Sequence, residues 1–306
     1  MITYKPARER TPDTQYQDLL RRILTTGRRI HPIHGRLHSA PEGDAIMVLG
    51  AQMRFDMSNG FPLQPIRDNT KSFPGALGEL IGFLHGARTL ETLKEYGCPA
   101  VFWEKWVTKE KCEIFGLPEH DLGDGSYGAA WASFPQPDGT PFNQVEHLIK
   151  QIKERPYLRT HILTPWIPFY TLQHSELKRK VVVAPCHGWV HVVAFPETKE
   201  LSLHHYQRSG DVPVGVVLNM VEYAALGMLI AREIGYTFVE YVHTISDAHL
   251  YESQIPFVEE LLAREPRTLP TVTLDESITT VLDARREHFT LTDYNPHPRM
   301  IIPTPV

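Results

Sequence analysis

Three features of the sequence predict an α/β fold of the α+β kind, in which helices cover a twisted, mixed β-sheet. Several segments alternate apolar and polar residues with the period of a strand, and one long apolar segment, 214–234, has the period of a helix. The strand candidates follow one another without the regular intervening helices of a doubly wound sheet. Because no repeat, low-complexity stretch or linker interrupts the 306 residues, we expect a single domain over residues 1–306.

Composition and charge exclude several classes of protein. Hydrophobic residues make up 42% of the chain and charged residues 22%, as in ordinary globular proteins. A net charge of −5 and an isoelectric point near 6.3 give no general basic surface for a nucleic acid, so we expect small-molecule partners at local anion sites. No apolar run approaches the roughly 20 residues that span a bilayer, so no membrane partner is expected. Three cysteines, an odd number, and an N-terminus without an apolar signal region favour a reducing, cytoplasmic location.

Periodicity and stop signals place the elements along the chain. Helices are expected over residues 16–28, 72–86, 92–96, 143–154, 214–234 and 255–264, with a helical turn at 277–286. Strands are expected over residues 46–57 and 159–166, on both sides of Cys186, and over residues 201–206, 236–242 and 269–274. The proline-rich tail, residues 293–306, cannot be a helix, and it must either dock or remain free.

Some polar and aromatic residues allow both a functional and a structural interpretation. The histidines His31, His34 and His38 fall in a loop-like segment, and we expect no metal there because no cysteine or carboxylate pattern completes a site. Glu79 lies within an apolar helical stretch, where it is either exposed or buried for a reason. The aromatic cluster at residues 102–106 is either a stacking wall for a planar ligand or part of the core.

The segment 181–251 gathers the residue types best suited to chemistry. Cys186 and His187 lie between two apolar runs, and a thiol at the end of a strand is a candidate nucleophile. The same segment contains residues 206–211 (YQRSGD), Asn219 at the head of the long helix, and residues 247–251 (DAHLY). Together they supply a nucleophile, an anion site, an amide that can recognise a pattern of hydrogen-bond donors and acceptors, and two side chains that can bind hydroxyl groups.

These motifs, in this order and spacing, resemble thymidylate synthase, the folate-dependent enzyme that alkylates C5 of deoxyuridylate. The resemblance covers essentially the whole chain after the first dozen residues. It implies a thymidylate-synthase-like fold in which one face of the sheet forms a homodimer interface. The matching pieces are QMRFDMSNGFPL (52–63), GELIGFLHG (78–86), Phe102 with Trp103, APCH (184–187), YQRSGD (206–211), the Asn219 helix, DAHLY (247–251), REPRTLP (264–270) and YNPHP (294–298).

The resemblance implies a methyltransferase that converts dUMP and the co-substrate 5,10-methylenetetrahydrofolate to dTMP and dihydrofolate, without a metal. Cys186 would add to C6 of the pyrimidine, because C5 is a poor nucleophile until a nucleophile adds there. Arg208 is the cation expected to favour the thiolate. Glu79, with Tyr127 and His187 organising water, would manage proton transfers around O4 and C5.

The same resemblance implies how the two substrates are held. Asn219 can donate to O4 and accept from N3 of uracil, and cytosine presents the opposite pattern. Arg159 would reach across from a second subunit, so the active unit would be a homodimer. The nucleotide is expected to contact Arg36, Arg159, Gln207, Arg208, Ser209, Asp211, Asn219, His249 and Tyr251. The folate is expected to contact Phe102, Trp103, Asp211, Val214, Gly215 and Leu218.

Several positions depart from the family pattern. The Arg-Thr-Gly phosphate loop expected near residues 29–44 is absent. The second cross-subunit arginine is Thr160, and the glutamine five residues after the cysteine is His191. A serine of the Asn219 helix is Glu222. These changes spare the residues expected to do the chemistry but alter their surroundings.

The departures leave the last chemical step open. Hydride from tetrahydrofolate gives the methyl product, whereas water gives the 5-hydroxymethyl nucleotide and regenerates tetrahydrofolate. The alternative function is therefore 5-hydroxymethylation of dUMP, or of CMP or dCMP. A third interpretation is an inactive paralogue that binds nucleotide, folate or RNA, although an idle site would have no need for Cys186, Arg208 and Asn219 together.

Overall fold

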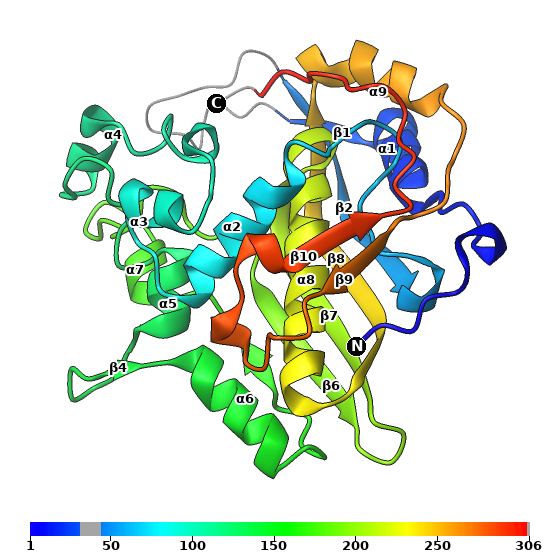
Figure 1. Cartoon of the computed structure of the whole chain (residues 1–306). Helices are drawn as coiled ribbons and strands as arrows, with labels where there is room; N and C mark the ends of the chain where they lie inside the picture. Colours follow the sequence, from blue (N-terminus) through cyan, green and yellow to red (C-terminus); the bar gives the residue numbers. More distant parts are fainter. Residues whose placement is uncertain (31–43, 305–306) are drawn as a thin grey trace.

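The computed structural model describes residues 1–30 and 44–304, and Figure 1 shows a central sheet with helices packed against it. Six strands form this sheet in the order β1-β2-β8-β7-β6-β5. Strands β7 and β8 are parallel and the other neighbouring pairs are antiparallel, which confirms the predicted mixed sheet. The strands are β1 Arg28–Ile30, β2 Ala45–Asp56, β5 Ile162–Leu163, β6 Trp189–Phe195, β7 Glu200–Asp211 and β8 Thr237–Tyr251.

The long helix α8, Val217–Ile234, crosses the middle of the molecule (Figure 1) and packs on β7 and β8. A π-helical turn, Val212–Val216, precedes it. Turn and helix form an apolar helix of 23 residues, Val212–Ile234, which by length and composition could cross a membrane. The expectation that no apolar run approaches this length is therefore wrong. Within the protein 83% of this apolar window is buried, and apolar residues on all sides are typical of a core helix.

The other helices cover the sheet and the ends of α8. Helix α2, Phe73–Leu84, packs directly against α8 and is buried along nearly its whole length. The remaining helices are α1 Gln15–Thr26, α3 Leu90–Glu95, α4 Lys109–Ile114, α5 Tyr127–Ala132, α6 Gln144–Glu154, α7 Pro168–Thr171 and α9 Ile255–Leu262. Two small hairpins complete the fold, β3 Phe134–Pro135 with β4 Pro141–Phe142 and β9 Thr271–Leu274 with β10 Phe289–Thr292.

Several element predictions are wrong in detail. The segment just before Cys186 is an irregular loop rather than a strand, and the strand expected over 159–166 is reduced to β5. The helical turn expected at 277–286 consists of two short 3₁₀ turns, Val281–Asp283 and Arg286–His288, and β10 was not expected. The Asn143 side chain caps α6, because it accepts the backbone N–H of Glu146.

The C-terminal tail docks along the surface. The Tyr294 hydroxyl donates to the carbonyl groups of Gln64 and Arg67, at 3.1 and 3.0 Å. Farther along, the Pro303 carbonyl accepts from the Gln254 side chain, and Ile302 is buried. Backbone groups therefore hold the tail in place without secondary structure.

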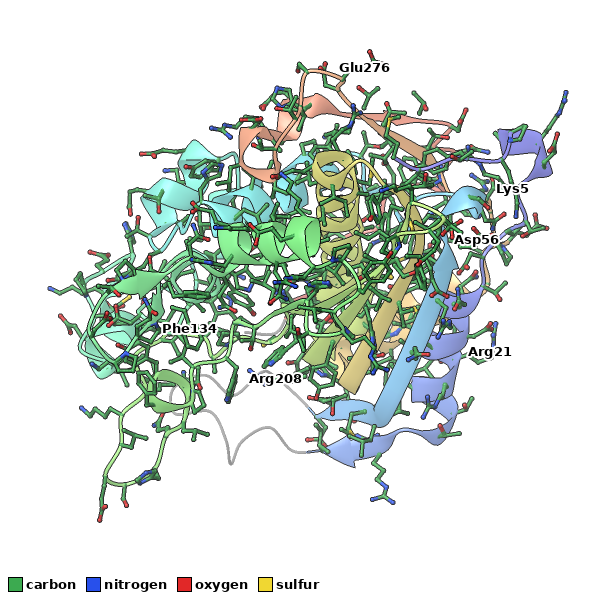
Figure 2. All side chains as sticks on the ribbon, turned by 90° about the horizontal axis from the view of Figure 1, so that it is seen from below. Lys5, Arg21, Asp56, Phe134, Arg208 and Glu276 are labelled. Carbon is green, nitrogen blue, oxygen red and sulfur yellow. The ribbon has the colours of Figure 1, made fainter. Side chains whose placement is uncertain are left out.

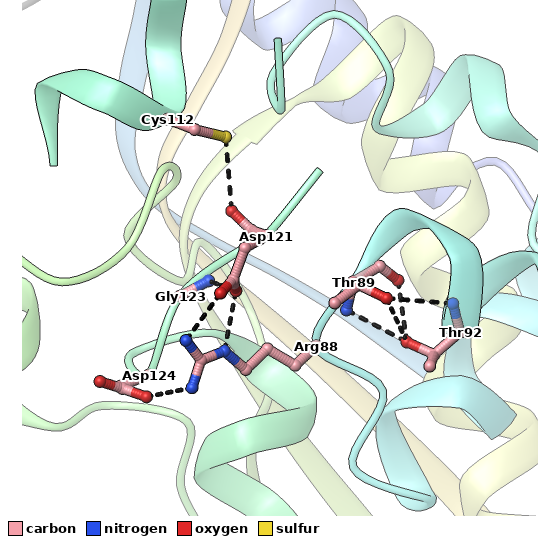
Figure 3. Close-up of polar contacts among 7 residues, drawn as sticks. All are labelled: Arg88, Thr89, Thr92, Cys112, Asp121, Gly123 and Asp124. Atoms are coloured by element: carbon pink, nitrogen blue, oxygen red, sulfur yellow. Dashed lines mark hydrogen bonds and ion pairs between the residues drawn. The ribbon is translucent and has the colours of Figure 1, made fainter. Parts of the chain in front are cut away.

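A cluster around Arg88 anchors the glycine-rich loop that leads into α5 (Figure 3). The Arg88 guanidinium bonds both carboxylate oxygens of Asp121, at 2.8 and 2.7 Å, and also contacts Asp124. The Asp121 carboxylate accepts the Gly123 backbone N–H at 2.8 Å, and its carbonyl accepts from the Cys112 thiol. This bidentate arrangement fixes the loop immediately before Tyr127, the first residue of α5.

The close approach of α2 to the segment around Gly97 yields a stability prediction. A Cβ atom on Gly78 would lie 2.5 Å from the Gly97 carbonyl carbon and 2.7 Å from the Cys98 nitrogen. Backbone atoms cannot move aside by a rotation as the end of a side chain can. Gly78→Ala is therefore expected to lower the free energy of unfolding by about 2 kcal/mol, even though alanine favours the helix. Urea denaturation measures the change.

Gly82 provides the matched control in the same helix. A Cβ atom there would approach the end of the Leu93 side chain, at 2.9 Å, which can move aside. Gly82→Ala is expected to change the free energy of unfolding by less than about 1 kcal/mol. Equal losses for the two variants would contradict the proposed backbone contact.

Candidate active site

Cys186 lies in the loop before β6, where its backbone is held from two sides. Its N–H donates to the Tyr127 hydroxyl at 2.7 Å, and its carbonyl accepts the Arg208 N–H at 2.7 Å. The side chain is half-buried, and its sulfur lies 3.3 Å from Arg208 Nη2. Arg208 therefore places a positive charge directly beside the candidate nucleophile.

The Arg208 guanidinium is fixed by carbonyl groups rather than by carboxylates. Its Nε donates to the Pro185 carbonyl at 2.8 Å and its Nη2 to the Ala184 carbonyl at 2.7 Å. Its Nη1 has no hydrogen-bond partner among the described residues, so it can face an anion. Figure 2 shows Arg208 between the strands of the sheet and the lobe that carries Phe134. Nearby, burial and then the charge of Arg208 lower the pKa of Arg179, which was not singled out from the sequence.

The rings of Tyr127, His187 and Tyr223 form the wall behind the cysteine. The rings of Tyr127 and His187 stack with their centroids 4.4 Å apart, and His187 Nδ1 lies 2.6 Å from the Tyr223 hydroxyl. Burial, with the nearby charges of His243 and Arg208, lowers the pKa of His187 to about 3. His187 is therefore neutral near neutral pH and can exchange hydrogen bonds with water or substrate.

Asn219 lies among buried polar side chains at the start of α8. Its Oδ1 accepts from Gln207 Nε2 at 2.9 Å, and its Nδ2 donates to Glu222 Oε2 at 3.2 Å. Burial raises the pKa of Glu222 and of Glu79, and the neighbouring charge of Glu79 raises that of Glu222 further. The surroundings therefore favour a proton on this pair of carboxyl groups beside Asn219.

Trp103 belongs to this buried group rather than to an open wall. Only 7% of its surface is exposed, and its indole N–H donates to the Glu79 carboxylate. Its ring packs edge-on against Phe83 and Tyr127. Of the two alternatives for the aromatic cluster, the core interpretation thus describes Trp103, whereas Phe102 is partly exposed.

The pair expected to bind a sugar hydroxyl comes together with Ser209. Ser209 Oγ donates to Asp247 Oδ2 at 2.8 Å, and Asp247 Oδ1 lies 3.1 Å from His249 Nδ1. The rings of His249 and Tyr251 meet edge to face with centroids 5.3 Å apart. Three motif residues are therefore linked across the parallel strands β7 and β8.

Asp211 has a structural partner set that the sequence did not indicate. Its side chain accepts the Val214 backbone N–H at 3.3 Å and the Gln254 amide at 3.0 Å, and burial raises its pKa. It therefore caps the π-helical turn that contains Val214 and Gly215, while Leu218 follows in the first turn of α8. These residues lie together at one end of β7.

One predicted site residue, Arg159, is not joined to Cys186 in the single chain. Arg159 is exposed in the loop before β5, and no described hydrogen bond or ion pair joins it to Cys186. Arg36, like the histidines at 31, 34 and 38, lies outside the described residues. Within residues 1–30 and 44–304, no group of three or more His, Cys, Asp or Glu side chains is arranged to hold a metal ion.

Three buried residues that were not singled out from the sequence form hydrogen bonds leading to Gln207. They are His205, Tyr241 and His243. Strand alternation was the available signal, since His205 shares a face of β7 with Gln207. The same alternation places His191 on the other face of the sheet, because its neighbours Val190 and Val192 point into the core. Of the two departures His191 and Glu222, only Glu222 is hydrogen-bonded to Asn219.

Comparison with known proteins identifies one family. A sequence model described as thymidylate synthase matches residues 14–306. The match covers nearly the whole chain and includes every residue of the site described above.

The buried histidines predict how stability depends on pH. The folded pKa values of His187 and His243 are about 3, against an ordinary value of 6.5. Below pH 6.5 the unfolded chain takes up protons that the folded protein does not, so stability falls as the pH is lowered toward 3. Each histidine is expected to remove about 1 kcal/mol of unfolding free energy per pH unit.

His243→Gln isolates one of these contributions. Urea denaturation between pH 6.5 and 5 is expected to show a slope smaller than that of the wild type by about 1 kcal/mol per pH unit. The buried carboxyl groups titrate in both proteins, so their contribution cancels. Identical slopes would show that His243 is not held neutral.

Proposed function

Because the chain belongs to the thymidylate synthase family, we propose that it uses 5,10-methylenetetrahydrofolate to methylate dUMP at C5, giving dTMP and dihydrofolate. Membership in the family supports a folate-dependent transfer of a one-carbon unit to C5 of a pyrimidine nucleotide. The observation that carries the proposal for this chain is the Arg208 guanidinium 3.3 Å from the sulfur of Cys186. That pair provides an activated nucleophile beside a cation.

The proposed reaction begins with addition of the Cys186 thiolate to C6, which moves the electron pair of the C5–C6 double bond toward C5 and O4. C5 then bonds to the methylene carbon as one of that carbon's two C–N bonds in the folate breaks, and the C5 proton passes to a base. Elimination of tetrahydrofolate leaves an exocyclic methylene, and hydride from tetrahydrofolate completes the methyl group. Release of the cysteine restores the C5–C6 double bond. The Glu79–Glu222 pair, whose pKa values burial raises, is proposed to support proton exchange at O4.

Recognition of the nucleotide is proposed to use both ends of the site. Asn219 reads the base, while His249 and Tyr251, whose rings meet edge to face, bind the sugar hydroxyl. Arg208 holds the phosphate through Nη1 while Nη2 stays beside the sulfur. These assignments follow the family resemblance residue by residue.

A second subunit is proposed to complete the phosphate site by supplying Arg159. Tyr206 supports this arrangement, because it lies on the central strand β7 yet 38% of its surface is exposed, on the face opposite the buried His205. Sedimentation equilibrium is expected to show a dimer, and Tyr206→Asp is expected to yield a monomer with little activity. A wild-type protein that is active as a monomer would contradict this arrangement.

A hydroxymethylase is the second candidate, and Glu222 is the observation that favours it. This carboxyl group is buried, contacts Asn219 and Glu79, and stands where the family pattern has a serine. A carboxyl group can accept a hydrogen bond from a water molecule and orient it. Water added to the exocyclic methylene in place of hydride would give the 5-hydroxymethyl nucleotide.

One assay separates these reactions. The protein is incubated with dUMP and 5,10-methylenetetrahydrofolate, and both the nucleotide product and the folate oxidation state are identified. Formation of dTMP with an equal amount of dihydrofolate is the expected result. A hydroxymethyl product with tetrahydrofolate would establish the second candidate and reject the first.

Cysteine variants supply the controls for this assay. Cys186→Ser is expected to lower turnover by at least about three orders of magnitude, since it removes the attacking sulfur. Cys112→Ser, a buried thiol bonded to the Asp121 carbonyl, is expected to retain activity. Turnover by Cys186→Ser at the wild-type rate would rule out covalent catalysis by this residue.

A further inference from the structure

A continuous chain of hydrogen bonds runs through the core behind Asn219 and begins at Gly188. The Gly188 backbone N–H donates to His205 Nε2 at 3.0 Å, and His205 Nδ1 lies 3.4 Å from the Tyr241 hydroxyl. The same hydroxyl lies 3.2 Å from His243 Nδ1. All three side chains are fully buried, so their polar atoms depend on partners inside the protein.

The second half of the chain joins His243 to Asn219. His243 Nε2 lies 2.9 Å from Gln207 Oε1. Gln207 Nε2 donates to Asn219 Oδ1 at 2.9 Å and to the Ser209 carbonyl at 3.0 Å. Asn219 Nδ2 donates to Glu222 at 3.2 Å. The chain therefore ends on the side chain proposed to read the base, and the inference below rests on that proposed function.

Two backbone groups fix the direction of the bonds. A backbone N–H can only donate, so His205 Nε2 accepts, and the neutral ring carries its hydrogen on Nδ1 and donates to Tyr241. The tyrosine then donates to His243 Nδ1, which leaves the hydrogen of that ring on Nε2, facing Gln207. Independently, the Ser209 carbonyl can only accept, which requires the amide nitrogen of Gln207 on its side. Both anchors give the same direction.

Burial keeps the two histidine rings neutral, as this direction requires. Desolvation lowers the pKa of His205 well below its ordinary value and that of His243 to about 3. A protonated ring would carry hydrogens on both nitrogens and could not accept from its neighbour. Near neutral pH the chain therefore has a single direction.

The direction matters because an asparagine amide can pair with either pyrimidine after half a turn. Uracil offers a donor at N3 and an acceptor at O4, whereas cytosine offers an acceptor at N3 and a donor at N4. In the structure the oxygen of Asn219 faces Gln207 and its nitrogen faces Glu222. Glu222 is an electrostatic neighbour of Glu79, the group proposed to act at O4, so the amide nitrogen lies on the O4 side, as uracil requires.

We propose that His243 and Tyr241 are positioning residues that lock the Asn219 amide in the orientation that pairs with uracil and rejects cytosine. They act through Gln207 and do not touch the nucleotide. The site is thereby specific for uridine nucleotides. When these hydrogen bonds are broken, the side-chain oxygen of Gln207 loses its donor, His243, and the Asn219 amide rotates more freely. The affinity for a cytidine nucleotide then rises relative to that for a uridine nucleotide.

Calorimetric titration with dUMP and with dCMP tests this specificity in the full chain without requiring turnover. The wild type is expected to bind dUMP more tightly. His243→Leu is expected to reduce the ratio of the dissociation constant of dCMP to that of dUMP about tenfold. This is the change expected when one hydrogen bond no longer distinguishes the two bases. His243→Gln keeps a donor toward Gln207 and is expected to recover most of the ratio.

Two tyrosine variants provide a matched pair. Tyr241→Phe removes only the hydroxyl, keeps the ring stacked on Phe55 and is expected to reduce the ratio by an intermediate amount. Tyr4→Phe removes a hydroxyl that donates to the Val272 carbonyl, away from the chain, and is expected to leave the ratio unchanged. If His243→Leu does not fold, Tyr241→Phe and His243→Gln decide the outcome.

An unchanged ratio of the two dissociation constants in the folded variants of His243 and Tyr241 overturns the proposal. A loss of packing alone would weaken the binding of both nucleotides equally and would leave that ratio unchanged. Release of tritium from C5-labelled dUMP is measured in parallel. The expected binding ratios without tritium release would contradict the proposed reaction and support the positioning role. Tritium release with unchanged ratios would support the proposed reaction and contradict the positioning role. A wild type that binds neither nucleotide would overturn both the reaction and the positioning role.

Discussion

The contact between the Arg208 guanidinium and the Cys186 sulfur depends on how the guanidinium is held. Carbonyl groups of Ala184 and Pro185 fix its orientation, and no ion pair joins it to a carboxylate within the described parts of the chain. Neutral acceptors position the side chain without cancelling its charge. The charge is therefore available both to the sulfur and to a bound anion, and one residue can serve two functions.

The groups behind this contact are driven toward their neutral forms. Burial lowers the pKa of His187 and raises the pKa values of Glu79 and Glu222, so it disfavours the charged form of each of these side chains. In a weakly polarisable interior, the interaction of a cation with a thiolate extends farther than in water. The polar side chains behind the cysteine thus provide hydrogen-bond direction, while Arg208 provides the charge.

The sequence predicted the residues that we propose for the chemistry, but not their surroundings. Apolar periodicity identified α8, and motif spacing identified Cys186, Arg208 and Asn219, because such patterns are local. The polar chain behind Asn219 depends on the register that sets His205 beside His243, and pairing register between distant strands cannot be derived from either strand alone. The contact between Asp211 and Gln254 was missed for a similar reason, since Gln254 belongs to another part of the chain.

The parallel pairing of β7 and β8 explains why the motifs converge. Helix α8 connects these two strands, so its first turn begins where β7 ends, at the carboxyl edge of the pair. The register sets Ser209 beside Asp247 and Asp211 beside His249, which unites the two motifs at that edge. Asn219 enters from the first turn of α8. In sheets with parallel strands, ligands bind at the carboxyl ends of the strands. A slip of one residue in this register would turn Gln207 away from Asn219 and separate the base-reading amide from the chain that orients it.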